Sequence, residues 1–351
     1  MGATAAALVF CCYAASLLPC LLLLGGLSDR IGRSVALMLG LGCAIAAALL
    51  MAIHGSFGTL IVARILQGLS VGLSFSAGAA WMRELISHAR AAHLTTASTA
   101  TGFGFGPLIT FLIVEIWPQT AAAGATPFSY WAHPVLAAVA ALLLIGIPHP
   151  HDRAPAGHRP PLATLPLLPH GTWPAGLAIF TGWASAGLVI GVLQRALRDF
   201  GLDHWAGLCV FCITMAGFLM QPLAQRIGPD RSVRLGILIL PPAFLLIGIG
   251  VNFGWLIPLL AGAALNGASS FGFAYLGGLR IFQSATTHSQ ARAAAGYFLW
   301  IYLGFSLPVL GGGALADWIG MTRMLIVFGS TVTVLCTLAL VGLARRRPQE
   351  A

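Results

Sequence analysis

Eleven long apolar runs follow one another along this chain, separated by short polar stretches. A run of about 20 apolar residues crosses the hydrocarbon core of a bilayer as one helix. Helices suit this setting because their backbone hydrogen bonds are satisfied within the segment itself. We therefore predict an all-α polytopic membrane protein with about eleven transmembrane helices. The predicted spans are residues 5–27, 34–54, 57–82, 94–117, 131–148, 174–196, 204–225, 233–252, 255–279, 293–315 and 322–344.

The composition supports this class and excludes others. Of the 351 residues, 58% are hydrophobic and 8% are charged, whereas soluble domains carry roughly a quarter charged residues. The net charge of +9 does not indicate a nucleic-acid-binding protein, because the basic residues stand in ones, twos and threes between apolar runs and form no continuous basic patch. We therefore expect the lipid bilayer, and no nucleic acid, as a partner.

The arginines predict the orientation of the chain, because cytoplasmic loops of membrane proteins are enriched in basic residues. Alternate loops hold fourteen arginines on one side and three on the other. This bias predicts a cytoplasmic C-terminus. The membrane that we expect is the inner membrane of a bacterial cell. The richer set is Arg30, Arg33, Arg83, Arg90, Arg153, Arg159, Arg226, Arg231, Arg234, Arg280, Arg292, Arg345, Arg346 and Arg347, and the poorer set is Arg195, Arg198 and Arg323.

The longest polar break covers residues 149–172 and is rich in Pro, His and charge, which is typical of a linker. We predict a five-helix N-terminal bundle (1–148), a cytoplasmic linker (149–172) and a six-helix C-terminal bundle (173–351). Histidines in a Pro-rich linker are not expected to hold a metal ion in fixed geometry, so we expect no metal site here.

A short motif recurs at an offset of 196 residues. Gly25-Gly-Leu-Ser-Asp-Arg-Ile-Gly-Arg33 follows the first span, and Gln221-Pro-Leu-Ala-Gln-Arg-Ile-Gly-Pro229 follows the seventh, with Leu, Arg, Ile and Gly in register. Repeated bundles are common in transporters. Because the offset leaves the first bundle one helix shorter than the second, the sequence predicts a twelve-helix plan that lacks its first helix.

The first copy resembles the G-x-L-[AS]-D-R-x-G-R signature of the major facilitator superfamily, which lies in the loop between the second and third helices. The matching residues are Gly25, Asp29, Arg30, Gly32 and Arg33; Ser34 departs from the basic residue that is usual next. The resemblance implies the major facilitator fold, with two helical bundles and alternating access. It also implies that this charged set latches the cytoplasmic side shut and releases it during transport.

A second motif lies inside the third span. Arg64-Ile-Leu-Gln67-Gly68-Leu-Ser70-Val-Gly72 is similar to the R-x-x-Q-G motif of helix four in the same family, and the resemblance implies a role for Arg64 in proton coupling or in holding substrate-linked charge. A snorkelling Arg64 is the alternative, since a charge inside a span is costly without a polar partner. The spacing of Gly68 and Gly72 predicts close approach of another helix.

Glycine and proline predict bends in two later spans. Gly106-Pro107 partly matches the helix-five motif associated with antiporters, and Pro308 lies in a related place in the second half. Glu115, near the outer end of its span, is a candidate proton site, although an interfacial position is the alternative. None of the acidic residues lies in the middle of a span.

The resemblance implies a substrate cavity near the bilayer midplane, lined by family helices one, four, seven and ten. Small polar residues also pack helices together, so each candidate has a structural alternative. The candidates are Gln67, Ser70, Thr181, Trp183, Ser185, Asn266, Ser269, Ser270 and Tyr275.

The predicted function is secondary transport of a small solute by alternating access, with proton-coupled efflux favoured by the motifs of the third and fourth spans. Uptake by symport or uniport is the alternative, and a transport-inactive sensor or partner protein is the alternative of another class. We expect no enzyme activity, cofactor or metal, since the chain has no phosphate-binding loop and Cys209-Val-Phe-Cys212 stands alone within an apolar run. The expected partners are a small-molecule substrate and protons, bound by a monomer.

Overall fold

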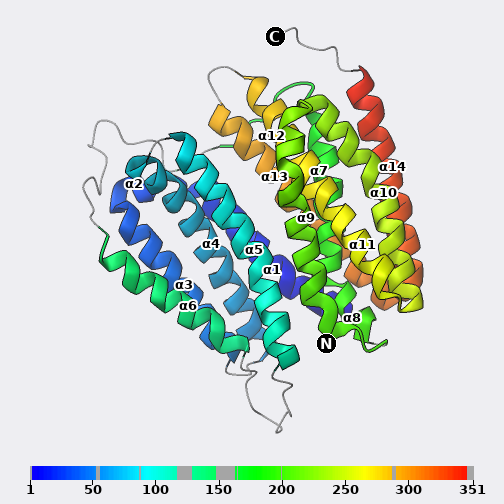
Figure 1. Cartoon of the computed structure of the whole chain (residues 1–351), viewed down its shortest axis with the longest axis horizontal. Coiled ribbons are helices and arrows are strands. Elements are labelled where there is room, and N and C mark those ends of the chain that lie inside the picture. The colour runs from blue at the N-terminus through cyan, green and yellow to red at the C-terminus, as the bar shows by residue number, and fades with distance from the viewer. Residues whose placement is uncertain are drawn as a thin grey trace. The chain divides into compact units, whose positions relative to one another are not determined.

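The computed structural model describes residues 2–52, 56–86, 88–116, 129–147, 163, 165–198, 200–286 and 290–345. Within these residues every element is helical, which confirms the predicted all-α polytopic fold (Figure 1). The helices are α1 (Ala3–Leu23), α2 (Ser28–Ile31), α3 (Arg33–Ala52), α4 (Phe57–Leu85), α5 (His88–Ile116), α6 (Ser129–Ile145), α7 (Trp173–Gly191), α8 (Leu193–Arg198), η2 (Asp203–Trp205), α9 (Ala206–Arg226), α10 (Pro229–Phe253), α11 (Leu256–Gly267), η3 (Ala268–Ala274), α12 (Tyr275–Ser284), α13 (Gln290–Ile319) and α14 (Met321–Arg345).

Each predicted span coincides with one helix or with a continuous series of helices. In the part of the chain that the structure describes, nine helices are long and apolar enough to cross a membrane, and two shorter apolar stretches, Thr101–Ile113 and Tyr130–Ile145, match the fourth and fifth predicted spans. The ninth span is built from α11, η3 and α12 in succession.

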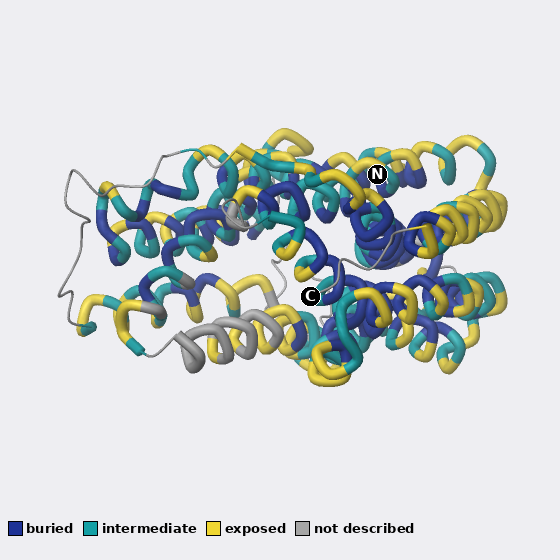
Figure 2. Tube along the Cα trace, turned by 90° about the horizontal axis from the view of Figure 1, so that it is seen from above, coloured by how far each residue is buried: buried dark blue, intermediate teal, exposed yellow. Residues whose placement is uncertain are grey.

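Apolar side chains lie on the outside of these helices as well as inside. On α6, Leu136, Leu142 and Leu143 are each more than 60% exposed, and exposed residues run along the helices in Figure 2. Such a surface would be unfavourable in water, but it matches lipid, whose tails are as apolar as Leu.

The residues fall into two compact units. Unit 1 comprises Met1–Cys11, Gly102–Phe111 and Pro166–Ala351, and unit 2 comprises Cys12–Thr101 and Leu112–Leu165. The core of unit 1 contains buried residues of α7, α9, α10, α11, α13 and α14. Most of the predicted linker lies outside the described residues, namely 149–162 and 164, as do Arg346 and Arg347, so the linker and the orientation stay predictions.

The repeated motif has the same backbone conformation in both copies. Gly32 ends α2 with φ 103° and ψ 148°, and Gly228, 196 positions later, precedes α10 with φ 84° and ψ 161°. Both conformations lie in a region that is essentially restricted to glycine. The internal repeat read from the sequence is therefore also a repeat of local structure.

Candidate functional site

The charged motif of unit 2 is a compact cluster around Arg33. Its Nη2 lies 2.5 Å from the Asp29 carboxylate, and its Nη1 donates to the Ser28 hydroxyl at 2.6 Å. Its Nε donates to the Glu84 carboxylate at 3.0 Å. The turn at Gly32 places Asp29 and Arg33 side by side, while Glu84 comes from the end of α4. The cluster therefore ties the α2 turn and the start of α3 to the end of α4.

Two members of this cluster, Ser28 and Glu84, were not among the predicted site residues. Glu84 could have been predicted as a partner of the motif, because the end of the third span is predicted to lie on the same side of the membrane as the loop after the first span. The other motif residues take a smaller part: Arg30 is exposed, and Gly25 lies in the turn before α2.

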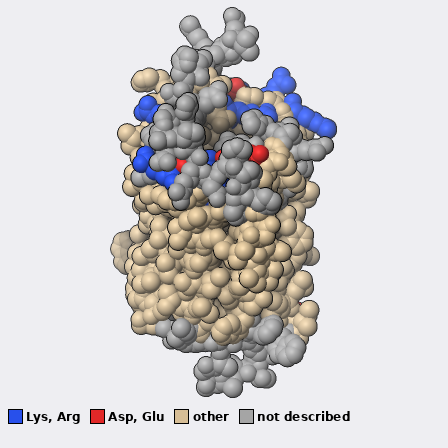
Figure 3. Space-filling model, turned by 90° about the vertical axis from the view of Figure 1, so that its left-hand side faces the viewer, with Lys and Arg blue, Asp and Glu red and all other residues tan. Residues whose placement is uncertain are grey.

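Charged side chains gather at one end of the molecule on the face shown in Figure 3. Below them, the visible part of that face is a broad band without Arg, Asp or Glu. Such a band is expected for the part of a helical protein that lies in hydrocarbon.

Arg64 lies on α4 and is only partly exposed. Its Nη1 donates to Oε1 of Gln67 at 2.9 Å, and Nε2 of Gln67 lies 3.3 Å from the sulfur of Met51. Its Nε is buried and has no hydrogen-bond partner. The phenol groups of Tyr13 and Tyr130 lie near enough to interact electrostatically with the guanidinium. Arg64 and Gln67 of the motif thus contact each other. Tyr13 and Tyr130 were not predicted as site residues.

The glycines of the same motif lie against α1. A Cβ at Gly68 would meet the hydroxyl of Ser16 and the carbonyl of Tyr13, and one at Gly72 would lie 2.7 Å from the sulfur of Cys20. The predicted close approach of another helix is confirmed, and the partner is α1.

The remaining unit 2 candidates are Ser70 and Glu115. Ser70 is buried, and its carbonyl would lie 3.1 Å from a Cβ added at Gly40 of α3. Glu115 is the penultimate residue of α5 and is exposed. Its position favours the interfacial reading over a proton site deep in the membrane.

The polar candidates of unit 1 surround a π-helical turn, η3. Asn266 donates through Nδ2 to the Ser185 hydroxyl at 2.6 Å, and the Ser270 hydroxyl donates to the Asn266 carbonyl at 2.6 Å. Ser269 donates to the Gly236 carbonyl at 2.7 Å, and Thr181 donates to the Leu177 carbonyl at 2.8 Å. All these candidates are at most 1% exposed. In this conformation their hydrogen bonds are therefore made within the protein.

The two aromatic candidates differ from this group. Trp183 is partly exposed and packs against Phe271 of η3 and against Phe305 of α13, but its Nε1 is buried without a hydrogen-bond partner. Tyr275, also partly exposed, has its ring 6.4 Å from that of Tyr297. Among the unit 1 candidates, Trp183 therefore has a buried donor without a partner.

The predicted bend residues lie inside long helices. Pro107 is within α5 and Pro308 is within α13, and the Thr110 hydroxyl donates to the Gly106 carbonyl at 3.1 Å. A Cβ added at Gly207 would lie 2.7 Å from the Pro107 carbonyl, so α9 approaches α5 closely here. Interior prolines are tolerated in membrane helices because neighbouring groups satisfy the freed backbone.

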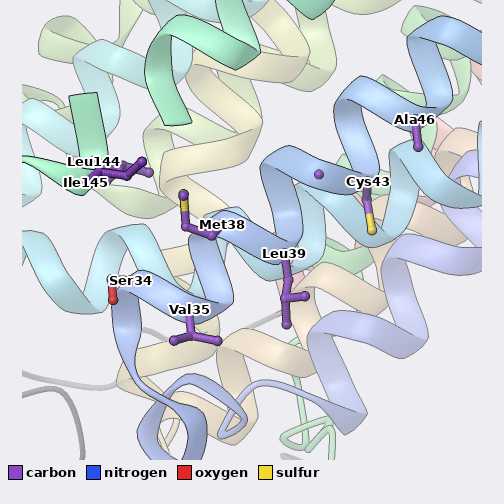
Figure 4. A pocket seen from close by; sticks show the side chains of 9 residues that line it. Ser34, Val35, Met38, Leu39, Cys43, Ala46, Leu144 and Ile145 are labelled. Carbon is purple, nitrogen blue, oxygen red and sulfur yellow. The ribbon is translucent and has the colours of Figure 1, made fainter. Parts of the chain in front are cut away.

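None of the candidate residues lines a groove in unit 2, which begins at Ser34, next to Arg33. It has a volume of about 580 Å³ and is lined by α3 and α6, with Met38, Cys43 and Leu144 among its side chains (Figure 4). Its lining is almost entirely apolar, so a lipid tail suits it better than a polar solute. Among the described residues there is no group of three His, Cys, Asp or Glu that could hold a metal ion.

Comparisons with known proteins agree with this architecture. The family model described as "Major Facilitator Superfamily" (MFS_1) matches residues 1–208, more than half of the chain. No match is found among curated protein sequences. A solved structure of a mutant of the nucleoside transporter NupG is similar with a TM-score of 0.77 and 12% identity, over 97% of this chain and 91% of that one.

A mutant of the peptide transporter POT in complex with sulfate is similar with a TM-score of 0.73 and 13% identity, over 98% of this chain and 85% of that one. At these identities the likeness shows the fold alone, which is the fold that the resemblance of residues 25–33 to the family signature implied. With the family model matching more than half of its length, this integral membrane protein belongs to the major facilitator superfamily.

Proposed function

We propose that the protein is a secondary transporter that exports a small solute by alternating access in exchange for protons. In this proposal it works as a monomer, with its C-terminus on the cytoplasmic side of a bacterial inner membrane. The Arg33 cluster serves as the cytoplasmic latch, because its partly buried ion pairs join α2, α3 and α4 at one end of unit 2.

The observation that carries the proposal is the state of Arg64. It lies in a membrane-spanning helix, donates one hydrogen bond to Gln67, and keeps its buried Nε without a partner. A guanidinium in a span is costly unless a partner compensates it. A counter-charge or acceptor that arrives and leaves during the cycle supplies a reason to retain it. We propose that an acceptor group of the solute takes that role during part of the cycle, and that Gln67 holds the guanidinium in place.

We assign solute binding to polar candidates of each unit, taken separately. Gln67 and Trp183 have the strongest support. Both are partly exposed; Gln67 accepts a hydrogen bond from Arg64, whose Nε lacks a partner, and Nε1 of Trp183 itself lacks one. Glu115 is retained as a proposed proton site, at the exposed end of α5.

Purified protein in liposomes that contain a trapped pH-sensitive dye tests this proposal. Each member of a panel of small solutes is added outside, and both solute uptake and lumenal pH are followed. Antiport predicts solute entry with a lumen that becomes more alkaline. An acidified lumen would indicate symport, flux without a pH change would indicate uniport, and no flux for any solute would indicate a sensor or partner protein.

Two variants sharpen the measurement. Arg64→Gln removes the charge inside the span and is expected to abolish the pH change. Arg226→Gln, at the exposed end of α9, removes an equal charge outside the membrane and is expected to leave flux and pH change intact. Equal loss in both variants would contradict the role given to Arg64.

A further inference from the structure

The indole N–H of Trp183 is a buried donor without an acceptor. In the described part of the chain, only three buried side-chain polar atoms lack a hydrogen-bond partner, and Nε1 of Trp183 is one of them. Buried indole N–H groups usually find a partner, and leaving one unpaired costs free energy. An unsatisfied buried group therefore calls for an explanation, and an acceptor supplied by a ligand is one.

Three aromatic rings surround this indole. The ring of Phe271 lies 4.5 Å from it at an interplanar angle of 33°. Phe305 and Tyr302 meet it edge-on, at 5.4 Å and 6.2 Å. A ring face accepts a hydrogen bond only weakly, so these neighbours do not replace a true acceptor. Trp183, Phe271 and Tyr302 are only half-buried, so a change of rotamer can open the site to a ligand.

The backbone around the site is fixed in an unusual way. The η3 turn carries Phe271 and is π-helical, a feature that is frequent at functional sites. A Cβ at Gly182 would lie 2.9 Å from the Cβ of Ser270, so α7 approaches the turn closely beside Trp183. The Asn266–Ser185 hydrogen bond ties the same two segments together. These contacts hold the backbone of α7 against that of η3, whereas the indole N–H of Trp183 has no acceptor.

The surroundings specify an uncharged ligand. The stretches that supply the rings, residues 173–193, 256–279 and 297–316, contain no Asp, Glu, Lys, Arg or His. An ion placed there would lose its hydration without gaining a counter-charge from these stretches. Flat rings gain most from aromatic neighbours in offset-stacked or edge-to-face contact.

We propose that Trp183, Phe271, Tyr302 and Phe305 recognise a flat, uncharged ring that carries a hydrogen-bond acceptor, such as a lactam carbonyl, and that the Trp183 indole N–H donates to that acceptor. This inference rests on the proposed function, since it names the class of solute that the transporter takes. It also assigns three aromatic residues that the sequence did not mark.

Calorimetric titration of the full-length protein in detergent tests the site with three probes. The probe 2-quinolone is flat and neutral and has a lactam carbonyl. Indole is a similar ring system without a good acceptor, and quinoline-2-carboxylate is a similar ring with a negative charge. The expected order of affinity is 2-quinolone, then indole, then the carboxylate. Tighter binding of the carboxylate than of 2-quinolone, or binding of none of the three, would overturn the proposal.

The variant Trp183→Phe removes the donor but keeps an aromatic ring. It should weaken 2-quinolone by about five- to tenfold relative to indole, the loss expected for one hydrogen bond. The matched variant Trp300→Phe, on α13 with its ring against Phe180, should change neither affinity. An unchanged ratio of the two affinities in Trp183→Phe would reduce Trp183 to a packing residue.

A second variant keeps the test valid if Trp183→Phe folds poorly. Phe271→Leu removes the ring nearest to Trp183 but retains the N–H, and it should weaken both neutral probes by a similar factor; unchanged affinities would overturn the site. The experiments distinguish a wrong assignment of the aromatic site from a wrong assignment of the transport function. Solute flux in liposomes without probe binding rejects the site alone, whereas probe binding without flux of any solute rejects the transport function.

Discussion

Arg33 and Glu84 lie 51 residues apart in sequence, yet Nε of the arginine donates to the glutamate carboxylate at 3.0 Å. The pair joins the first residue of α3 to the penultimate residue of α4. Because Arg33 also pairs with Asp29 and is only 13% exposed, it is the centre of the cluster, and the motif residue Arg30 is not.

Replacing Arg33 with Gln should therefore destabilise the protein. The loss of charged, partly buried hydrogen bonds costs about 1–3 kcal/mol, and we expect a clear drop in melting temperature in detergent. Arg30→Gln removes the same charge from an exposed neighbour and should leave the melting temperature almost unchanged. An equal effect of both substitutions would show that net charge, and not the cluster, determines stability.

A double-mutant cycle separates the two acidic partners of Arg33. Glu84 is 38% exposed and Asp29 is 14% exposed, so solvent screens the Glu84 pair more strongly. Coupling of Arg33 to Asp29 should exceed coupling to Glu84, which should stay below about 1 kcal/mol. The cycle is measured from the melting curves of Asp29→Asn, Glu84→Gln and their combinations with Arg33→Gln.

The two repeated glycines make a third prediction. Gly32 and Gly228 hold a conformation in which other residues are strained, so alanine at either position should cost about 1–3 kcal/mol. Gly248, inside α10 with open space where a Cβ would be, is the control, and Gly248→Ala should be neutral or slightly stabilising. The melting temperatures of the three variants test this prediction. An unchanged melting temperature in Gly32→Ala would contradict the requirement for glycine at this position.

The fold could be predicted from the sequence because each transmembrane helix is encoded by a continuous run of apolar residues. Every predicted span has a helix at its place, since about 20 apolar residues are enough to define it. The ends were less exact: α4 continues to Leu85 and α13 begins at Gln290, because a helix can extend through polar residues once it leaves the hydrocarbon.

The site was less predictable, because small polar residues look alike in sequence whether they face a cavity or pack two helices. Asn266 and Ser185 bind each other only because α7 and α11 lie together, which no local pattern encodes. The π-helical turn that carries Phe271 also depends on tertiary contacts, such as the approach of Gly217 to its backbone. Trp183 was a predicted candidate, but the sequence does not show that its indole N–H is buried without an acceptor, because this depends on the packing of three separate helices.

Packing of α1 on α4 gives a fourth prediction. A Cβ at Gly68 would run into backbone and side-chain atoms of α1, whereas one at Gly78 of the same helix would have Leu37 as its nearest neighbour at 3.7 Å. Gly68→Ala should cost about 1–3 kcal/mol through overpacking, and Gly78→Ala should cost nothing. The comparison uses the yield of monodisperse protein and its melting temperature, and similar values for both variants would argue against a close contact at Gly68.

The hydrogen bond between Asn266 and Ser185 makes the last prediction, because both residues are fully buried and only 2.6 Å separates Nδ2 from Oγ. Asn266→Ala leaves Ser185 without this partner, and Ser185→Ala leaves the amide N–H without an acceptor. Each single substitution should therefore destabilise the protein by about 1–3 kcal/mol. The double substitution should cost less than the sum of the two, since it leaves neither group unpaired. If both residues instead served mainly to bind solute, the single variants would melt like the parent protein and lose flux in liposomes.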